Sequence, residues 1–418
     1  MVSHHGSGAW FALKLQREGN DVDVYLLDHK CERILQGIID PYIFIKPDFS
    51  RYDFVIFDST GKPHLAEEAS KHAPTLGDSN IASALEDDRL FGIEVMERYG
   101  IEVPPYEVFD SGQLEEAKDF VAKNKDKRYV FKPFSVGSQE QDTATTYKGE
   151  SAEDLIEYID KLEELSHNSE FILQEVVQGT EISTEGWFDG EEFFLINSTL
   201  EEKKFMNDCI GPNTGCAGNI VWTYGANPRI FKAGLEKLIP FLQEAEYTGM
   251  LDLNTIVNNS HVWGLEWTPR FGYDAAATLF HALASDIGEF LFRITTGDGF
   301  EPRISSPFSA SARITIPPYP SECEEYYHEG VPINGIDAED IPNIYLYDAC
   351  IENNDLVTAG VTGFVCAVLG KGSSFDTAWY FVEEQIKNIK IPDMQYRSDL
   401  ARSTRKRFQE LSVMGYLK

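Results

Sequence analysis

The fold of this chain is decided by one stretch, Thr248-Gly-Met-Leu-Asp252-Leu-Asn-Thr-Ile-Val-Asn-Asn-Ser-His-Val-Trp-Gly-Leu-Glu266-Trp-Thr268-Pro-Arg270-Phe-Gly272. Two apolar, β-rich runs flank a short polar turn, which is typical of a β-hairpin. Such a hairpin can bring Asp252 and Glu266 side by side. Facing carboxylates repel each other unless a cation lies between them, so the stretch predicts a Mg²⁺ site that bridges to nucleotide phosphates. Arg270 could add a permanent positive charge there. The alternative is a hairpin with ordinary, solvated surface carboxylates.

Residues 1–102 predict a small α/β domain with a parallel sheet. A glycine-rich turn at 2–8 precedes a helix that starts at Ala9, and a strand follows at 21–27. The dinucleotide fingerprint GxGxxG is incomplete, so the glycines are expected to form a tight turn. A further strand and two helices are expected at residues 52–57, 64–71 and 84–99.

Residues 103–190 predict strands at 106–109 and 128–133, and helices at 111–124 and 151–165. Lys132 lies among apolar residues of the second strand. Lysines are seldom buried without a partner, so Lys132 could bind phosphate in a cleft. A lysine that protects an edge strand is the alternative.

Residues 191–303 contain the opening hairpin, a strand at 192–197, and helices at 228–246 and from Asp274. The segment 208–218 is rich in Gly and Pro and is expected to be a loop. Such a loop could direct backbone N–H groups at an anion, or it could be a plain surface loop.

Residues 304–418 predict short strands, a helix at 373–388 and a basic tail that starts at Tyr396. A short basic run on an acidic protein is expected to form a helix that packs on the protein's own acidic surface.

Composition narrows the function classes. The 418 residues indicate two to four domains, and the net charge of −33 disfavours binding to nucleic acid or anionic membranes. An anionic substrate would therefore need local cations or Mg²⁺. No apolar run of membrane-spanning length and no signal peptide are expected. The six cysteines are scattered, which is typical of reduced thiols in a cytoplasmic protein. Cys209 and Cys216 have no further ligands near them for a zinc site.

Four segments carry a resemblance to known proteins. They are Gly211-Pro-Asn-Thr-Gly215, Leu265-Glu-Trp-Thr-Pro-Arg-Phe-Gly272, and the C-terminal pair Asp355-Leu-Val-Thr-Ala-Gly-Val-Thr-Gly-Phe-Val and Tyr396-Arg-Ser-Asp399. They resemble motifs of the ATP-grasp superfamily, and within it the phosphoribosylamine–glycine ligase family of purine biosynthesis. The similarity runs along nearly the whole chain.

The resemblance implies an α/β and α+β multidomain fold. It implies an N-terminal α/β pre-ATP-grasp domain (1–102), ATP-grasp lobes A (103–190) and B (191–303), and a β-rich C-terminal domain (304–418). It also implies an ADP-forming carboxylate–amine ligase that works through an acyl phosphate and uses ATP with Mg²⁺, or Mn²⁺. The expected substrates are glycine or another amino acid and an amine, which could be phosphorylated. The expected protein is a cytoplasmic monomer or homodimer.

The resemblance also implies roles for individual residues. Lys132 would contact ATP phosphates, Glu181 would bind the ribose, and Arg270 and Lys203 would stabilise charge on the reacting groups. Adenine would lie against Gln174, Glu175 and Val177. The metal ligands would be Asp252, Glu266 and Thr268. The substrate side would be lined by Gly211, Pro212, Asn213, Thr214 and Gly215.

Three positions depart from the family pattern. Thr268 replaces the usual metal-binding Asn, and Gln174 replaces a commoner Glu. The expected lid, residues 135–142, has a single glycine and added acid. These departures favour a second hypothesis, a catalytically weakened ATP-grasp protein that binds nucleotide or a partner. The polar positions that are retained favour the ligase.

Overall fold

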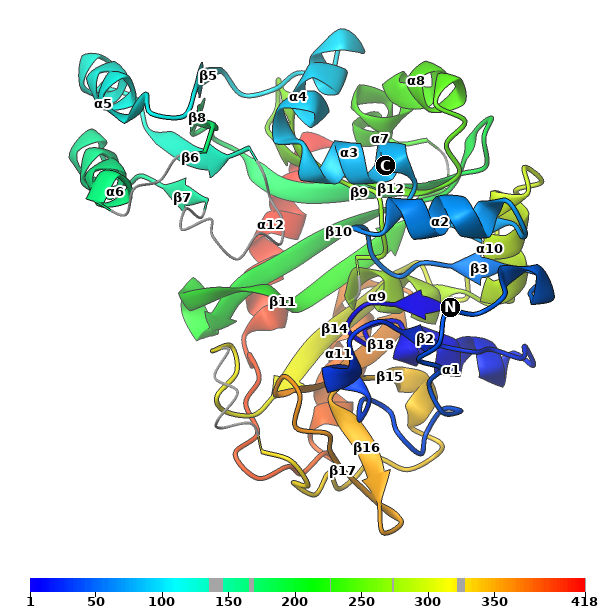
Figure 1. The fold of residues 1–418 in the computed structure, drawn as a ribbon. Helices are drawn as coiled ribbons and strands as arrows, with labels where there is room; N and C mark the ends of the chain where they lie inside the picture. The colour runs from blue at the N-terminus through cyan, green and yellow to red at the C-terminus, as the bar shows by residue number, and fades with distance from the viewer. Residues whose placement is uncertain (135–145, 165–168, 226, 273, 322–327, 418) are drawn as a thin grey trace.

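The computed structural model describes residues 1–134, 146–164, 169–225, 227–272, 274–321 and 328–417. Helices and strands alternate near the N-terminus, and two larger sheets follow (Figure 1). The expected lid at 135–142 lies outside the described residues. The mixed α/β and α+β class expected from the sequence is confirmed.

The N-terminal region contains two pairs of short parallel strands, each pair joined through a helix. Its elements are β1 (Val2–Ser3), α1 (Ala9–Arg17), β2 (Tyr25–Leu26), η1 (His29–Cys31), η2 (Phe49–Arg51), β3 (Val55–Ile56), α2 (Pro63–Ser70) and β4 (Thr75–Leu76). β1 pairs with β2, β3 pairs with β4, and a bridge from Val2 to Phe57 runs parallel between the pairs. The predicted parallel arrangement is present, with shorter strands than expected.

The glycine-rich segment after β1 forms the tight turn that was expected. The Gly8 N–H donates to the Asp58 carboxylate at 2.7 Å, and Ser3 Oγ donates to the same oxygen at 2.5 Å. A Cβ on residue 8 would lie 2.8 Å from that oxygen, so the close approach requires glycine. The turn therefore binds a buried carboxylate of the protein itself.

The helix predicted at 84–99 is broken. Instead α3 (Asn80–Asp87) and α4 (Arg89–Arg98) meet at Asp88. Asp88 has an extended backbone, and its side chain accepts the N–H of Phe91, so it caps the second helix. An Asp at this position stops one helix and starts another because it competes for backbone donors.

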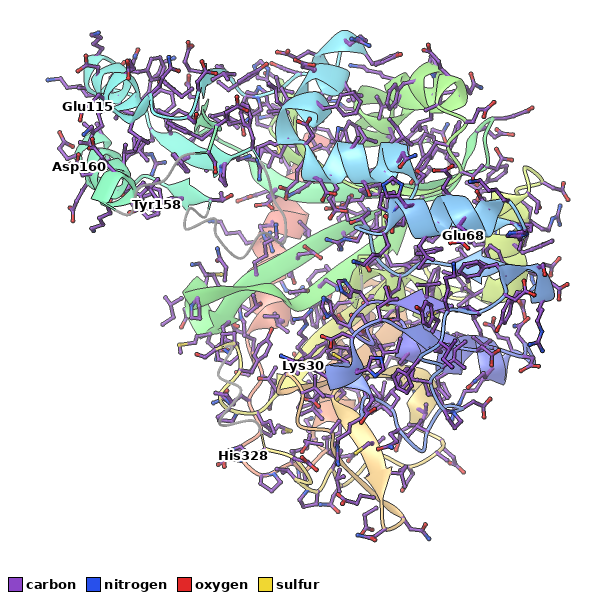
Figure 2. The ribbon with its side chains drawn as sticks, viewed as in Figure 1. Lys30, Glu68, Glu115, Tyr158, Asp160 and His328 are labelled. Atoms are coloured by element: carbon purple, nitrogen blue, oxygen red, sulfur yellow. The ribbon has the colours of Figure 1, made fainter. Side chains whose placement is uncertain are left out.

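A four-stranded antiparallel sheet forms a separate layer with two helices (Figure 1). In spatial order its strands are β5 (Tyr106–Phe109), β8 (Phe171–Glu175), β6 (Tyr129–Pro133) and β7 (Tyr147–Lys148), and its helices are α5 (Leu114–Lys123) and α6 (Ala152–Glu164). The ammonium of Lys118 joins the helices by pairing with Glu115 and Asp160, both labelled in Figure 2. The predicted elements of this region are confirmed.

An eight-stranded antiparallel sheet forms the centre of the molecule. Its order is β13 (Val262–Thr268), β12 (Gly249–Val257), β9 (Thr180–Phe188), β10 (Phe193–Met206), β11 (Ile210–Thr223), β14 (Phe308–Thr315), β18 (Phe364–Gly372) and β15 (Ile344–Leu346). The sheet crosses the expected boundaries at 190/191 and 303/304. The division into four domains therefore stays a prediction.

Helices cover the central sheet. They are α7 (Arg229–Ala233), η4 (Leu235–Leu238), α8 (Ile239–Glu244), α9 (Asp274–Ala282), α10 (Ile287–Thr295), α11 (Phe375–Ile386) and α12 (Leu400–Met414). The helix predicted at 228–246 is wrong as a single unit, because Gly234 leaves the helical conformation between α7 and η4. The remaining short elements are η3 (Asn207–Cys209), η6 (Ile341–Asn343), β16 (Ala349–Glu352) and β17 (Asp355–Thr358).

The basic tail forms α12 and packs on acidic groups of the same chain, as predicted. Arg405 pairs with Asp376, Arg402 with Asp208 at 2.6 Å, and Arg407 with Glu202 at 2.5 Å. Within the described part of the chain, no helix is both long and apolar enough to cross a membrane.

Candidate functional site

One face of the central sheet is polar along several neighbouring strands. On β9 the alternation of side chains directs Glu181 and Glu185 to this face, and the register places Asp252 of β12 opposite Glu185. Ser183 donates to Asp252 at 3.1 Å, and the Asn254 amide donates to Glu181 at 2.9 Å. Distant segments of the sequence therefore contribute carboxylates to one surface.

The hairpin of β12 and β13 is confirmed, but its register differs from the expected facing pair. Asp252 lies opposite Thr268, and Glu266 lies opposite Asn254, with a bulge after Asn254. Asp252 and Glu266 are thus diagonal neighbours on one face. Asp252 is buried, whereas the Glu266 side chain is 49% exposed. Asp252 and Thr268 are therefore the direct pair.

Three carboxylates of this face, Glu185, Glu201 and Asp252, lie where burial and their mutual repulsion oppose ionisation. Burial raises the pKa of Glu185 to about 7, and the neighbouring Glu201 contributes to the shift. Burial, followed by the charges of Glu185 and Glu201, raises the pKa of Asp252 well above its usual range. Asp252 Oδ1 is buried and has no hydrogen-bond partner among the described residues. A divalent cation would relieve this repulsion.

These carboxylates do not form a closed metal cage. Among the described residues, only His5, Asp28 and Cys31 form a group of three His, Cys, Asp or Glu ligands with all ligand atoms within 4.8 Å. Asp252 and Glu266 would need other oxygens to complete a metal site. Mg²⁺ commonly keeps waters and takes substrate phosphates as ligands, so an incomplete protein set suits it.

Two lysines lie near the polar face. Lys132 on β6 is buried and donates to Gln174 Oε1 at 2.8 Å. Burial lowers the pKa of Lys132 to about 8, although the nearby charge of Glu266 acts to raise it. Lys203 on β10 pairs with Glu181 at 3.0 Å. Although burial lowers the pKa of Lys203, the charges of Glu181 and Glu201 raise it overall. Lys132 is thus the cation that is less compensated by carboxylates.

The predicted adenine-binding segment starts at Gln174 of β8, the residue that accepts the hydrogen bond from Lys132. The Gln174 side chain is buried, and its Nε2 has no hydrogen-bond partner among the described residues. Glu175 pairs with Lys127 at 2.7 Å, so its carboxylate is already occupied. Val177 is half-buried in the connection to β9. Gln174 is the member of this segment with an unused donor.

Arg270 lies where the hairpin suggested, but it has an acidic partner. Its Nη2 is 2.9 Å from Glu86 of α3. Arg270, Glu266 and Thr268 line one cavity of about 180 Å³ with Arg89. Arg89 is buried, and its Nη1 is 3.9 Å from Glu266. The sequence analysis did not single out Arg89, because the predicted helix at 84–99 placed it inside a helix. In the structure Arg89 stands at the first position of α4, where a cation is electrostatically unfavourable.

The loop predicted at 208–218 is wrong, because most of it belongs to strand β11. The segment from Gly211 to Gly215 continues a ribbon with β10 that extends beyond the sheet (Figure 1). Two register shifts opposite it and a positive φ at Gly211 show why turn-forming residues occur in a strand: they sit at bulges. Thr214 Oγ1 donates to the Lys203 carbonyl at 2.9 Å, and Gly211, Pro212, Asn213 and Gly215 are exposed.

A larger cavity of about 670 Å³ lies between N-terminal and C-terminal segments. His5, Asp274, Arg313, Tyr347 and Thr362 are among its lining residues. Arg313 binds Asp274 through two hydrogen bonds of 2.6 and 2.7 Å. Asn219 of β11 pairs with Glu201 on one side and Ser311 on the other, so Arg313 lies on the same face of the sheet as Glu201 and the cavity adjoins the polar face.

The sequence reading did not identify Glu185, Glu201, Asp274 or Arg313. The available signal was Arg313, the one charged residue in the strand at residues 308–315. Glu185 and Glu201 gave no such signal, because their shared surface depends on which strands pair.

The sequence is similar to those of phosphoribosylamine–glycine ligases and related proteins. A sequence model of the phosphoribosylglycinamide synthetase ATP-grasp (A) domain matches residues 87–276. A phosphoribosylamine–glycine ligase of Leptospira interrogans is 23% identical over 354 residues, which cover 79% of this chain and 78% of that protein. A bifunctional purine biosynthetic protein of Schizosaccharomyces pombe is 25% identical over 338 residues, 78% of this chain and 42% of that protein.

Solved structures share the fold. The crystal structure of a phosphoribosylamine–glycine ligase from Thermotoga maritima has a TM-score of 0.73 at 19% identity, covering 95% of this chain and 98% of that one. A biotin carboxylase from Campylobacter jejuni has a TM-score of 0.66 at 13% identity, covering 99% and 94%. Residues 87–276 therefore match a phosphoribosylglycinamide synthetase ATP-grasp (A) domain, and the chain as a whole shares the fold of these solved structures.

Proposed function

We propose that this protein is an ADP-forming, ATP-dependent carboxylate–amine ligase that works through an acyl phosphate. The observation that carries this proposal is the polar face, which gathers Glu181, Asp252 and Glu266 beside Lys132 and Lys203. Phosphoryl transfer needs positioning and charge compensation more than covalent groups from the protein. An ATP-grasp domain with this charge pattern suits that reaction.

The residues of the polar face fit Mg²⁺. The donors are carboxylate and hydroxyl oxygens from Asp252, Glu266 and Thr268, and one Asp252 oxygen is buried without a partner among the described residues. Bound Mg²⁺ would neutralise phosphate charge and orient the transferred group. Lys132 would hold phosphate oxygens, and Glu181 would accept hydrogen bonds from the ribose.

Substrate recognition is proposed for the two cavities that adjoin this face. The smaller cavity places Arg270 and Arg89 near Glu266, where they would stabilise charge on the acyl phosphate. The larger cavity, with Arg313 and Thr362, would receive the amine. Glycine or another amino acid is the proposed carboxylate, and the proposed amine class includes phosphorylated sugars such as phosphoribosylamine.

The second candidate is a weakened ATP-grasp protein that binds nucleotide or a partner without turnover. The ion pair of Arg270 with Glu86 favours it, because an occupied guanidinium is less available to a substrate. The two candidates differ in turnover and share nucleotide binding.

The deciding experiment measures ADP and phosphate release with Mg²⁺-ATP, glycine and a panel of amines that includes phosphoribosylamine. The ligase proposal predicts release that depends on both the carboxylate and one of the amines. Nucleotide binding without release for any amine would support the second candidate instead. Omission of glycine while the amine is kept serves as the control for uncoupled ATP hydrolysis.

A further inference from the structure

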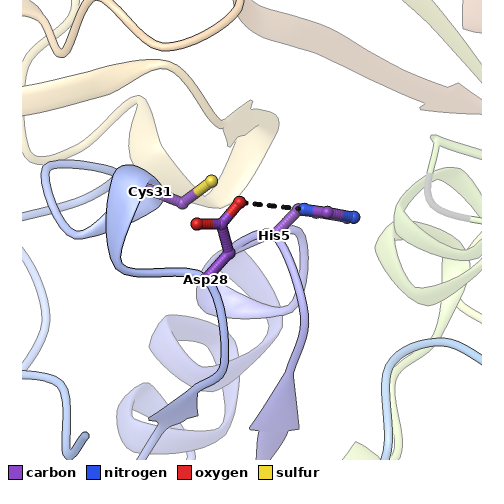
Figure 3. A group of neighbouring side chains, drawn as sticks. All are labelled: His5, Asp28 and Cys31. Carbon is purple, nitrogen blue, oxygen red and sulfur yellow. Dashed lines mark ion pairs between the residues drawn. The ribbon is translucent and has the colours of Figure 1, made fainter. Parts of the chain in front are cut away.

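A second cluster of chemically reactive side chains lies away from the polar face, at the ends of β1 and β2. His5 follows β1, and Asp28 and Cys31 follow β2. Parallel strands end at the same edge of a sheet, so the β1–β2 pairing brings these residues together across 23 and 26 positions of sequence. Figure 3 shows the Cys31 sulfur and the His5 ring on either side of the Asp28 carboxylate.

The local structure holds the three ligand atoms in place. Asp28 uses Oδ1 to accept the N–H of Lys30 and so caps η1, the short helix that carries Cys31. Its other oxygen, Oδ2, lies 3.6 Å from His5 Nδ1. The His5 ring stacks on His4 with ring centroids 4.0 Å apart. The Cys31 side chain is buried, and its thiol forms no hydrogen bond with any residue that the structure describes.

The spacing suits a shared metal ion better than a direct hydrogen bond. All three ligand atoms lie within 4.8 Å of one another. Two ligands bound tetrahedrally to one ion at about 2.1 Å are about 3.4 Å apart, close to the separation of Asp28 and His5. A 3.6 Å separation is too long for a hydrogen bond.

We propose that His5, Asp28 and Cys31 form a three-ligand site for a divalent transition metal of the zinc class. Mixed nitrogen, oxygen and sulfur donors select borderline metals such as Zn²⁺, whereas Mg²⁺ takes oxygen donors. Burial, with a contribution from Asp28, raises the pKa of the Cys31 thiol to about 11, so metal binding displaces a proton from this sulfur.

The fourth coordination position faces the larger cavity. His5, Asp28 and Cys31 all line it, together with Arg313 and Tyr347. Three protein ligands with one open position are typical of zinc sites that bind a water or a substrate group. The site therefore offers an anchoring point for a cavity occupant that carries a carboxylate, an amine or a hydroxyl. It is separate from the Mg²⁺ proposed at the central sheet and does not depend on ligase activity.

The test is a Co²⁺ titration of the 418-residue chain after chelation and under reducing conditions, followed by absorption spectroscopy. One equivalent of Co²⁺ should bind with a thiolate-to-cobalt charge-transfer band, and Zn²⁺ but not excess Mg²⁺ should displace it. Cys31→Ser should remove the band. His5→Asn should weaken binding at least about tenfold, and because His5 is exposed, this variant keeps the test valid if Cys31→Ser fails to fold.

Two matched controls each replace a cysteine or a histidine that is not part of the proposed site. Cys209→Ser replaces an exposed cysteine, and His29→Asn replaces an exposed histidine of η1. Both should bind Co²⁺ as the wild type does. The proposal is overturned if the wild type gives no charge-transfer band, if the band persists in Cys31→Ser, or if His5→Asn binds with unchanged affinity.

Discussion

Two neighbouring glutamates on β10 show how the two faces of one strand differ. Glu202 lies in a paired network, where Arg397 Nη1 is 3.0 Å and Arg407 Nη2 is 2.5 Å from its carboxylate. Burial would raise the pKa of Glu202, but Arg407, Ser403 and Arg397 lower it overall. Burial raises the pKa of Glu201, and Lys203 offsets this only in part.

The difference separates a structural cluster of carboxylates from a functional one. The cluster around Glu202 is compensated by arginines of the same chain, including the buried Arg397, which also binds Asp399 at 2.9 Å. The cluster of Glu201, Glu185 and Asp252 has fewer cationic side chains near it than carboxylates. A carboxylate cluster that lacks compensation within the protein is a candidate for binding a cation from solution. Four experiments test this contrast.

The largest effect is expected from Arg397→Ala. The Arg397 side chain is 1% exposed. Among the described residues, its removal leaves the buried Glu202 with Arg407 as its ion-pair partner and the buried Asp399 with only a 3.8 Å contact to the exposed Arg402. The free energy of unfolding should fall by about 3–5 kcal/mol, measured by urea denaturation. Arg402→Ala is the control, because Arg402 is 73% exposed, and its replacement should change stability by less than about 0.5 kcal/mol. Equal effects of the two variants would contradict a structural role for this cluster.

Glu266→Gln tests the functional cluster through turnover. Loss of a charge that compensates bound metal should lower ADP release about 100-fold, while the circular dichroism spectrum stays unchanged. Glu266 is half exposed, so its replacement should cost little stability. Unchanged turnover in an active preparation would show that Glu266 does not bind the catalytic metal.

Glu185→Gln should stabilise the metal-free protein in a pH-dependent way. The pKa of Glu185 rises from 4.5 to about 7 on folding, so the unfolded chain loses its proton first as the pH increases. Stability contributed by this group is therefore present below about pH 4.5 and lost as the pH rises to about 7. In EDTA at pH 8, the free energy of unfolding of the variant should be about 1–3 kcal/mol higher than that of the wild type. The difference should vanish near pH 4.

The matched variant Glu202→Gln should change the free energy of unfolding in the opposite direction at pH 8, by lowering it. Its pKa is lowered on folding, so the ionised form stabilises the protein above the unfolded pKa. Urea denaturation of both variants measures the contrast. If both variants destabilise the protein equally at pH 8, the two clusters do not differ as proposed.

The smallest effect concerns Lys132. Burial lowers its pKa to about 8, so it loses its charge in the free protein as the pH rises from 7 to 9. ATP affinity should fall by up to about tenfold over this range, measured by calorimetric titration at constant Mg²⁺. Lys132→Arg should bind ATP with little pH dependence, because arginine stays charged. A pH-independent affinity in the wild type would argue against phosphate binding by Lys132.

Much of the fold followed from local pattern. The hairpin of β12 and β13, the helices α5, α6 and α11, and the short parallel strands at the N-terminus were predictable because periodicity and turn residues are local signals. The errors also have local causes. Asp88 divides one predicted helix, Gly234 divides another, and bulges place Gly and Pro inside β11. A bulge and a loop have similar composition, so the sequence could not distinguish them.

The site was predictable only in part. Asp252, Glu266, Thr268 and Arg270 belong to one hairpin, so their proximity followed from the sequence. Their functional roles stay predictions. The pairing of Asp252 with Thr268 depended on a bulge, and the addition of Glu185 and Glu201 depended on strand order.

The sequence by itself determined that this chain carries a carboxylate-rich hairpin, a net charge of −33 and motifs of an ATP-grasp protein. Only the tertiary structure decided which carboxylates are compensated. Glu201 and Glu202 are chemically identical neighbours, and strand alternation directs them to opposite faces with different partners. Likewise, His5, Asp28 and Cys31 meet only because β1 and β2 run parallel and end together. Charge compensation and ligand convergence depend on distances between atoms, and these distances are set by packing between segments far apart in sequence.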